Sequence, residues 1–327
     1  MAKTILITGG AGYVGAVLAP YLLQKGHEVT VLDLMIYGED VLPNHKNLKK
    51  IKGDIRDKNL LNKELPNNDV LIHLACISND PSFELNPKLG KSINLDAFSP
   101  MVEIAKKSKI KRFIYASSSS VYGVKNEPNV DENMNLEPLT DYSKFKAECE
   151  KILFKDYSSN FTPIVIRPAT VCGYSPRQRL DVVVNILTNL AYHKKEITVL
   201  GGDQIRPNIH IFDMVRAYEY LINAEEDLVS GKIFNAGYEN QSVNHLASLV
   251  KKVIGDDVKI KHLESNDNRS YHISSKKIEK ELGFKTVKTI EDAIKDLKKA
   301  FDKKELVNTL TDEKYFNIKR MNNIDLK

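Results

Sequence analysis

The stretch Ile5-Leu6-Ile7-Thr8-Gly9-Gly10-Ala11-Gly12-Tyr13-Val14-Gly15 is the most informative part of this sequence about its fold. Its first three residues form a short apolar run, which predicts a buried strand. Three glycines at a spacing of three lead into an amphipathic pattern that predicts a helix over 13–24. Gly9 permits a tight turn, Gly12 lets the backbone approach a phosphate, and Gly15 allows the helix to pack closely. The start of the helix offers unpaired N–H groups and a partial positive charge, which suit a diphosphate.

An acidic residue strengthens this interpretation. A second strand is predicted over 28–32, and Asp33 follows it, eighteen residues after Gly15. A carboxylate at this place accepts hydrogen bonds from the ribose hydroxyls of adenosine and repels a 2′-phosphate. An ordinary strand and turn would be the simpler interpretation of the glycines alone. Together with Asp33 they predict a dinucleotide site and favour NAD over NADP.

The composition is that of a globular chain. Its 327 residues suffice for one large or two small domains, and 42% of them are hydrophobic. No apolar run approaches the roughly 20 residues of a membrane helix, and the first strand follows directly after Met-Ala-Lys, so we expect neither a membrane span nor a signal peptide. Cys76, Cys149 and Cys172 are scattered, which is typical of reduced thiols and indicates a cytoplasmic protein. The net charge of +5 is spread among mixed acids and bases, and the eight histidines show no ligand spacing, so we predict no nucleic-acid partner and no metal.

Strands and helices alternate through the first half of the chain, which predicts an α/β fold with a Rossmann-type, doubly wound parallel sheet. Further strands are expected over 49–52, 69–74, 112–116 and 163–167, and helices over 58–64, 91–108 and 141–157. In the second half we expect helices over 181–192, 212–223, 243–254, 274–282 and 289–302, and strands over 197–200, 233–236 and 258–262. The polar residues 306–327 form a C-terminal tail, and the pattern does not decide whether this tail is ordered.

Tyr142 and Lys146 are the residues most indicative of catalysis. On a helix, residues four apart share a face. A free tyrosine has a pKa of about 10, and a nearby lysine ammonium together with an oxidised nicotinamide favours the phenolate. A phenolate can take a proton from a sugar hydroxyl while hydride leaves the same carbon, and a serine hydroxyl opposite can hold the substrate oxygen. Tyr21/Lys25 and Tyr315/Lys319 show the same spacing, but only Tyr142 opens a helix after a strand that ends in serines.

The order of these motifs resembles that of the extended short-chain dehydrogenases/reductases, in the NAD-dependent nucleotide-sugar epimerase/dehydratase family. The motifs that carry the resemblance extend over about residues 3 to 285 and lie at 8–15, 53–55, 73–75, 117–123, 142–146, 167–168, 206–207 with His210 and Asp213, and 235–237. In this family they occur in the same order along the chain.

The resemblance implies a site for NAD. Tyr142 would be the catalytic base, Lys146 would bind the nicotinamide ribose, and Ser118 would be the catalytic serine, with Ser119 as the alternative in the run of four. Asp54 and Ile55 would contact the adenine. The cofactor-binding residues implied in full are Gly9, Gly12, Tyr13, Val14, Gly15, Asp33, Asp54, Ile55, Leu74, Ala75, Asn94, Tyr142, Lys146, Pro168 and Val171.

A nucleotide-diphosphate sugar is the substrate that the resemblance implies. Arg206 and Arg269 match basic residues that hold the diphosphate, because a guanidinium fork fits phosphate oxygens. A surface ion pair is the alternative for each arginine. The other expected substrate contacts are Ser118, Ser119, Arg179 and Asn185. His210 and Asp213 are expected to be structural.

Two departures from the family pattern bear on the reaction. The 4,6-dehydratases of the family carry Asp-Glu directly after the catalytic threonine, whereas this chain has Ser119 and Ser120, so we expect no dehydration. The loop 170–177 is also longer than the common version. We therefore expect hydride transfer at C4 by a 4-epimerase, with a 4-dehydrogenase close behind, in surface-polysaccharide sugar biosynthesis. A nucleotide-ketosugar reductase is a further alternative, and a non-catalytic NAD sensor is disfavoured by the intact Tyr142–Lys146 pair.

The resemblance also implies a division into lobes. Residues 1–168 with about 207–236 would form the NAD-binding lobe, about 169–206 with 237–305 the smaller substrate-binding lobe, and 306–327 the tail. Helices 91–108 and 141–157 form the four-helix bundle of a dimer in this family, so a homodimer is expected.

Overall fold

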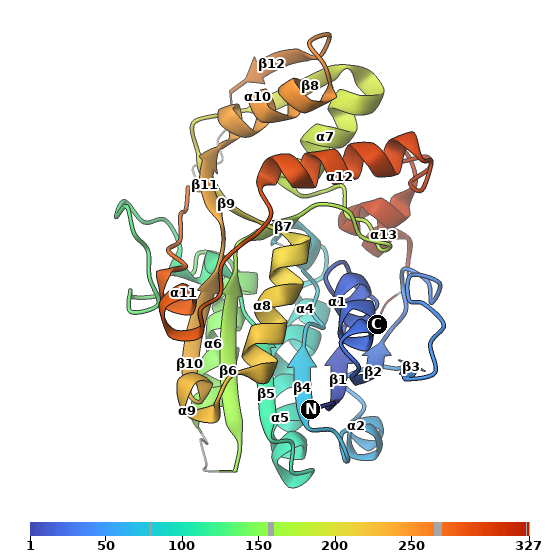
Figure 1. The fold of residues 1–327 in the computed structure, drawn as a ribbon, viewed down its shortest axis with the longest axis vertical. Helices are drawn as coiled ribbons and strands as arrows, with labels where there is room; N and C mark the ends of the chain where they lie inside the picture. Colours follow the sequence, from blue (N-terminus) through green and yellow to red (C-terminus); the bar gives the residue numbers. More distant parts are fainter. Residues whose placement is uncertain (79, 156–159, 265–269, 325, 327) are drawn as a thin grey trace.

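Seven parallel strands form the central sheet of the computed structural model, which describes residues 1–78, 80–155, 160–264, 270–324 and 326 (Figure 1). Their order across the sheet is β10-β6-β5-β4-β1-β2-β3. The strands are β1 (Thr4–Thr8), β2 (Glu28–Asp33), β3 (Leu48–Lys52), β4 (Val70–His73), β5 (Arg112–Ala116), β6 (Thr162–Pro168) and β10 (Lys232–Ala236). Every pairing is parallel. The predicted Rossmann-type fold class is confirmed.

The two faces of this sheet are covered by different helices, as alternation along a strand requires. Ile5 and Ile7 face one hydrophobic cluster, and Leu6 between them faces another; all three are fully buried. Full burial of each such side chain contributes about 1.5–3 kcal/mol. The first cluster includes side chains of α1 (Gly15–Gln24) and α8 (Ile211–Asn223), and the second includes side chains of α2 (Lys58–Glu64), α5 (Phe98–Lys107) and α6 (Asp141–Lys155).

The strand order reverses between β1 and β4. One neighbour of β1 is the next strand in sequence, β2, and the other is β4, which the chain reaches after β3. The strands before and after this crossover therefore lie on opposite sides of β1. Loops that diverge at the carboxyl ends of such strands leave a crevice, where ligands of doubly wound sheets bind.

The helix predicted over 91–108 is interrupted. The structure has α4 (Pro87–Lys91), a π-helical turn (Ser92–Asp96) and then α5. The Asn94 side chain lies inside this turn, accepting a hydrogen bond from the Ile77 N–H (2.8 Å) and donating one to the Ile77 carbonyl (2.9 Å). The prediction of one continuous helix was wrong because a tertiary contact widens the helix at this point, as is common for π-helical turns.

Two smaller sheets lie beyond the carboxyl ends of the central strands, at the top of Figure 1. One contains β7 (Thr170–Cys172), β9 (Ile205–His210) and β11 (Glu239–Ser242), and the other contains β8 (Glu196–Leu200) and β12 (Lys259–Leu263). The pattern did not predict β7, β9 or β11: β7 is only three residues long, Pro207 and Asn208 interrupt β9, and Glu239–Ser242 is polar throughout. Helices α7 (Val183–Lys194), α10 (Val243–Ile254) and α12 (Ile290–Asp302) bury their apolar faces in a common cluster. From this packing we propose the division into two lobes described above.

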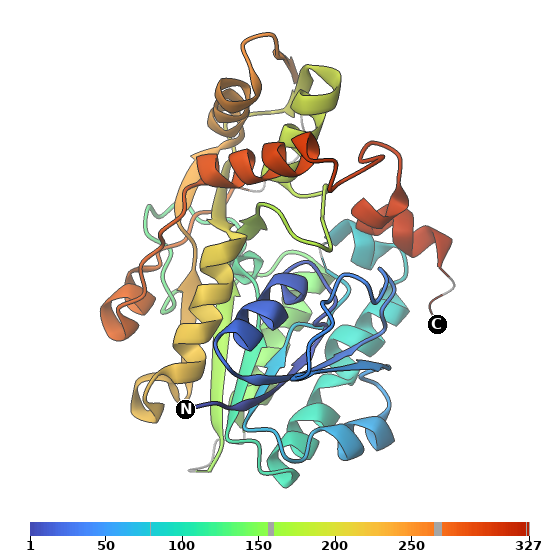
Figure 2. The same cartoon turned by 45° about the vertical axis from the view of Figure 1, so that its right-hand side comes forward.

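The described residues after 306 are ordered, which the sequence did not predict. Leu306 and Tyr315 are buried against α12, and α13 (Asn317–Asn323) lies beside α3 (Asp80–Glu84) (Figure 2). The Arg320 guanidinium donates to the Ile36 carbonyl at 2.6 Å. The remaining helices are α9 (Glu226–Val229) and α11 (Lys276–Leu282). No helix among the described residues is both long and apolar enough to span a bilayer.

Candidate active site

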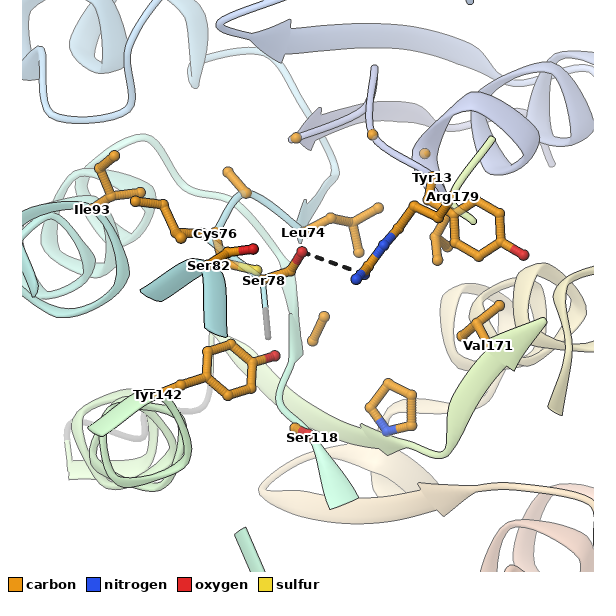
Figure 3. Close-up of a pocket in the computed structure, with 18 of the residues that line it drawn as sticks. Tyr13, Leu74, Cys76, Ser78, Ser82, Ile93, Ser118, Tyr142, Val171 and Arg179 are labelled. Atoms are coloured by element: carbon orange, nitrogen blue, oxygen red, sulfur yellow. Dashed lines mark hydrogen bonds between the residues drawn. The ribbon is translucent and has the colours of Figure 1, made fainter. Parts of the chain in front are cut away.

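A cavity of about 410 Å³ lies at the carboxyl ends of the central strands (Figure 3). Its wall includes the glycine turn after β1, the ends of β2 and β4, the serine turn after β5, and the first turns of α6. These segments are distant in sequence and meet here because parallel strands end at the same edge of the sheet.

The glycine turn has the shape of a phosphate cradle. Gly9 has a φ of +74°, and a Cβ on it would lie 2.5 Å from the Ala75 backbone nitrogen. A Cβ on Gly12 would meet only the Gly9 carbonyl oxygen, at 3.1 Å, so this position stays open to the cavity. Helix α1 begins at Gly15, two residues later than predicted. The residues present therefore fit the diphosphate of a dinucleotide.

Asp33 lies at the end of β2, beside this turn. Its carboxylate accepts hydrogen bonds from the backbone N–H groups of Ala11 (3.0 Å) and Met35 (2.8 Å). Burial raises the pKa of Asp33, and these two N–H groups act in the opposite direction. Each carboxylate oxygen keeps a further lone pair, so the group fits a ribose diol.

Asp54 and Ile55 line the neighbouring part of the wall. Burial tends to raise the pKa of Asp54, but hydrogen bonds from the Arg56 side chain and backbone lower it overall. The Arg56 Nη2 donates to Asp54 at 2.6 Å. Since Arg56 already engages the carboxylate, Asp54 remains ionised at neutral pH.

Tyr142 and Lys146 extend into the cavity from the first two turns of α6. The Lys146 ammonium donates to the Ala116 carbonyl at 2.6 Å and lies 5.8 Å from the centre of the Tyr142 ring. Burial raises the pKa of the Tyr142 phenol, as do the charges of Cys76 and Asp80, whereas the charge of Arg179 and the Ser118 hydroxyl act in the opposite direction. The phenol is therefore protonated in the absence of cofactor, and the Lys146 ammonium and the positive charge of an oxidised nicotinamide are what would favour a phenolate.

The four serines after β5 have different surroundings. The Ser117 hydroxyl donates to the buried Glu150 carboxylate. The Ser118 hydroxyl accepts from the Ser120 N–H at 3.1 Å and so begins a 3₁₀ turn, Ser119–Tyr122. Ser119 also borders the cavity but is 5% exposed. Ser118 is the less buried of the two serines, which favours it over Ser119 as the catalytic serine.

Most predicted site residues lie on this one cavity. Those in its wall are Gly9, Gly12, Tyr13, Val14, Gly15, Asp33, Asp54, Ile55, Leu74, Ala75, Ser118, Ser119, Tyr142, Lys146, Pro168, Val171 and Arg179. Their roles toward a ligand stay predictions, but the structure brings them together.

Three predicted residues do not border the cavity. The side-chain amide of Asn94 forms its hydrogen bonds with the backbone of Ile77, as described above. Asn185 is fully buried and bonds to the Gly173 N–H, the Tyr13 hydroxyl and the Arg179 carbonyl, so it holds the loop instead of facing a ligand. Arg206 lies 5.3 Å from the centre of the Tyr271 ring, and Tyr271 itself borders the cavity. Arg269 lies outside the described residues.

Other residues of the wall were not predicted from the sequence. They include Ile36, Tyr37, Ser78, Asp80, Arg177, Tyr271, Met321 and Leu326. Two arginines two positions apart in the long loop after β6 were a usable signal for Arg177. No pattern pointed to Met321 and Leu326, because their place depends on how the C-terminal residues fold back.

Comparison with known proteins identifies relatives of this chain. Residues 5–237 match the model of the NAD dependent epimerase/dehydratase family. The chain is 33% identical to the uncharacterized UDP-glucose epimerase YtcB of Bacillus subtilis, over 77% of this chain and 82% of the relative. It is 31% identical to a dTDP-D-glucose 4,6-dehydratase of Dictyostelium discoideum, again over 77% of this chain but only 62% of that relative.

Solved structures show the same fold. A UDP-glucose 4-epimerase of Thermotoga maritima, solved with UDP-glucose, superposes with a TM-score of 0.83 at 24% identity and covers 93% of this chain and 100% of its own. A UDP-glucuronic acid 4-epimerase of Bacillus cereus, solved with UDP-glucuronic acid and NAD, superposes with a TM-score of 0.81 at 25% identity, covering 90% of this chain and 99% of its own.

Proposed function

Because the chain belongs to the NAD-dependent epimerase/dehydratase family, we propose that it acts on a nucleotide-diphosphate sugar by hydride transfer at C4, with epimerisation preferred over dehydrogenation. The observation that carries this proposal is the arrangement of Tyr142, Lys146 and Ser118. All three lie on the cavity that also contains the glycine turn and Asp33. A proton-transfer site and a dinucleotide cradle therefore share one enclosed space.

The roles of the residues follow from their positions. NAD, when bound, accepts a hydride from a sugar carbon and can return it. Tyr142 removes the proton of the sugar hydroxyl, because its phenol borders the cavity beside Lys146 and Ser118. Lys146 is 4% exposed and has its ammonium near that ring, so it stabilises the phenolate. Ser118 orients the substrate oxygen by a hydrogen bond.

Dehydration across C5 and C6 is not part of the proposal. It needs an acid and a base next to the catalytic serine, and the structure has the hydroxyls of Ser119 and Ser120 there. Asp80, which also borders the cavity, accepts a hydrogen bond from Thr140 at 2.5 Å. These groups support chemistry confined to one carbon.

The relatives support the substrate class. Both 4-epimerases compared above are described with UDP-sugars, and we extend the class, though not the base or the sugar, to this chain. Arg206 and Tyr271, beside the cavity, are the proposed contacts to the substrate diphosphate.

Turnover by a Tyr142→Phe variant tests the proposal. Purified protein with NAD would be offered UDP-, GDP-, dTDP- and CDP-hexoses, and the products examined by NMR for inversion at C4 or for a 4-keto sugar. Loss of the phenolic proton acceptor should reduce turnover about 10²- to 10⁴-fold, the usual contribution of a general base, while NAD affinity changes little.

Tyr21→Phe is the matched control, because Tyr21 and Lys25 have the same spacing on α1 but lie on the surface, paired with Glu219. It should leave turnover unchanged. An accumulating 4-keto sugar would identify a 4-dehydrogenase instead of an epimerase. Wild-type turnover by Tyr142→Phe on the true substrate would show the proposed mechanism to be wrong.

A further inference from the structure

The loop that contains Arg177 and Arg179 is attached directly to the glycine turn. The Tyr13 hydroxyl donates to the Gly173 carbonyl at 2.6 Å, and the Ser175 hydroxyl donates to the Tyr13 carbonyl at 2.8 Å. These bonds attach the loop to the glycine turn a few residues before the two arginines. Both arginines border the cavity, and Figure 3 shows Arg179 extending from the side of Tyr13 toward Ser78.

Several N–H groups of the two arginines have no acceptor in the part of the chain that the structure describes. Arg177 is only 3% exposed, and its Nε and Nη1 donate to no atom among the described residues. The Arg179 Nη2 is also buried and without an acceptor there. Leaving buried donors of a charged group unpaired is costly, so these positions call for an acceptor that the described residues do not supply.

The charge of this corner points to an anion. Arg179 is paired with Asp181 at 2.9 Å, but no described carboxylate pairs with Arg177. Its guanidinium instead covers the Tyr37 ring, 3.5 Å from the centre. Asp33, on the same wall, directs its oxygens to two backbone N–H groups. The wall of the cavity thus contains guanidinium N–H groups as well as the glycine turn that leads into the positive end of α1.

Asn317, from the C-terminal helix α13, holds both arginines in this orientation. Its Oδ1 accepts from Arg177 Nη2 at 2.6 Å, and its backbone N–H donates to Asp181, the partner of Arg179, at 2.9 Å. Its Nδ2 donates to Ser78 at 2.9 Å. The guanidinium groups are therefore pre-organised before any ligand binds, which lowers the entropy cost of binding.

We propose that Arg177 and Arg179 form the second wall of the dinucleotide site and bind the diphosphate bridge of NAD from the side opposite the glycine turn. This assigns Arg179 to the cofactor and not, as the sequence suggested, to the substrate. The inference rests on the proposed function only for the identity of the dinucleotide. A fork of N–H donors on either side of one diphosphate is the arrangement that guanidinium groups favour.

The test measures NAD affinity in the absence of substrate. Arg177→Met and Arg179→Met proteins, freed of cofactor, would be titrated with NAD by calorimetry. Loss of charge-assisted hydrogen bonds should weaken NAD binding about tenfold to a hundredfold for each variant. Arg177→Lys, which keeps the charge without the fork, should fall between. Arg206→Met is the matched control and should bind NAD as the wild type does.

Two further readouts separate this role from a structural one. The melting temperature of cofactor-free Arg177→Met should equal or exceed that of the wild type, because an unpaired buried charge is removed, while the increase on adding NAD becomes smaller. The second readout is the affinity for UDP, GDP, dTDP and CDP, titrated into NAD-saturated proteins. Their dissociation constants for the variants should lie within about threefold of the wild-type values, because the loss of an ionic hydrogen bond would cost more than the ~0.7 kcal/mol of a threefold change.

Unchanged NAD affinity in both arginine variants would overturn the proposal. So would weaker binding of the nucleoside diphosphates at unchanged NAD affinity, which would return the arginines to the substrate. A lower melting temperature without loss of NAD affinity would assign them a structural role. Because NAD is titrated alone, the result stands even if no nucleotide sugar is turned over.

Discussion

Burial decides which polar side chains near the cavity keep a charge. His73, at the end of β4, is 2% exposed, and its ring stacks on Tyr115 with 5.7 Å between the ring centres. Its Nδ1 lies 2.7 Å from the Thr8 hydroxyl. Burial, assisted by the nearby charge of Lys146, lowers the pKa of His73 to about 3. His73 is therefore a neutral core residue, in contrast to Lys146, whose ammonium has a carbonyl partner.

We predict that His73 contributes a pH-dependent part of the stability. An unfolded histidine titrates with a pKa of about 6.5, so between about pH 6.5 and pH 3 the unfolded chain binds a proton that the folded chain excludes. Stability is complete above this range and falls as the pH decreases, by about 1.4 kcal/mol per unit or about 2 kcal/mol at pH 5. In His73→Phe, the difference in unfolding free energy between pH 7 and pH 5, measured with urea, should be smaller by this amount. Replacing the exposed His262 with Gln should leave this pH-dependent difference as in the wild type. If His73→Phe loses as much stability between pH 7 and pH 5 as the wild type does, the assignment to His73 is wrong.

Helix α6 connects the candidate site with the core. Tyr142, Lys146 and Glu150 are four residues apart and so share one face of the helix. The first two reach the cavity, whereas Glu150 lies deeper, where it accepts from Arg167 Nε at 3.0 Å and Nη2 at 2.6 Å. Arg167 in turn donates to the Tyr122 hydroxyl at 2.8 Å. This buried network ties α6 to β6 and to the serine turn, and so sets the distance between Ser118 and Tyr142.

Glu150→Ala should destabilise the protein by about 3–5 kcal/mol, because it leaves the Arg167 guanidinium buried without its counter-charge. The double variant Glu150→Leu/Arg167→Met should lose less stability than the single one, since it removes both charges. Urea unfolding measures both. Lys298→Ala, which breaks an exposed pair with Asp302, should cost less than about 1 kcal/mol. A Glu150→Ala cost equally small would show that the pair does not hold the two elements together.

The whole molecule encloses its cavity from three directions. The central sheet supplies the floor, the loop after β6 supplies one side, and the C-terminal residues add Met321 and Leu326. On the outside, α5 and α6 lie side by side on the face of the sheet away from α1 and α8 (Figures 1 and 2). These are the helices for which the family resemblance implies a dimer contact.

At this scale we predict a homodimer. Light scattering on the eluting size-exclusion peak should give twice the chain mass of 37.0 kDa, because two α5–α6 pairs can pack as a four-helix bundle with short interhelical distances. Dilution of the sample should not change the mass if the interface is a stable one. A mass of one chain at all concentrations would contradict the prediction and leave the outer face of α5 and α6 solvated.

Much of the site was predictable because its residues belong to local patterns. The glycine turn, Asp33 and the Tyr142–Lys146 pair each depend on contacts within one strand, turn or helix. Asn94 and Asn185 were placed less well, because their amides satisfy buried backbone and side-chain groups that only the folded chain brings near. Arg177 was missed as a wall residue, since its position depends on Tyr13, Tyr37 and Asn317 from three distant segments.

The parallel sheet, the glycine turn and the helix that carries Tyr142 and Lys146 were predictable from the sequence, since apolar periodicity and glycine spacing act over short stretches of chain. What encloses the cavity became clear only in the folded structure. The order of the described C-terminal residues, the widened helix at Asn94 and the burial of the Arg177 guanidinium all arise from contacts between residues more than a dozen positions apart. Such contacts produce no periodic pattern in the sequence, because each joins a single side chain to a single partner. Which two residues meet depends on the fold.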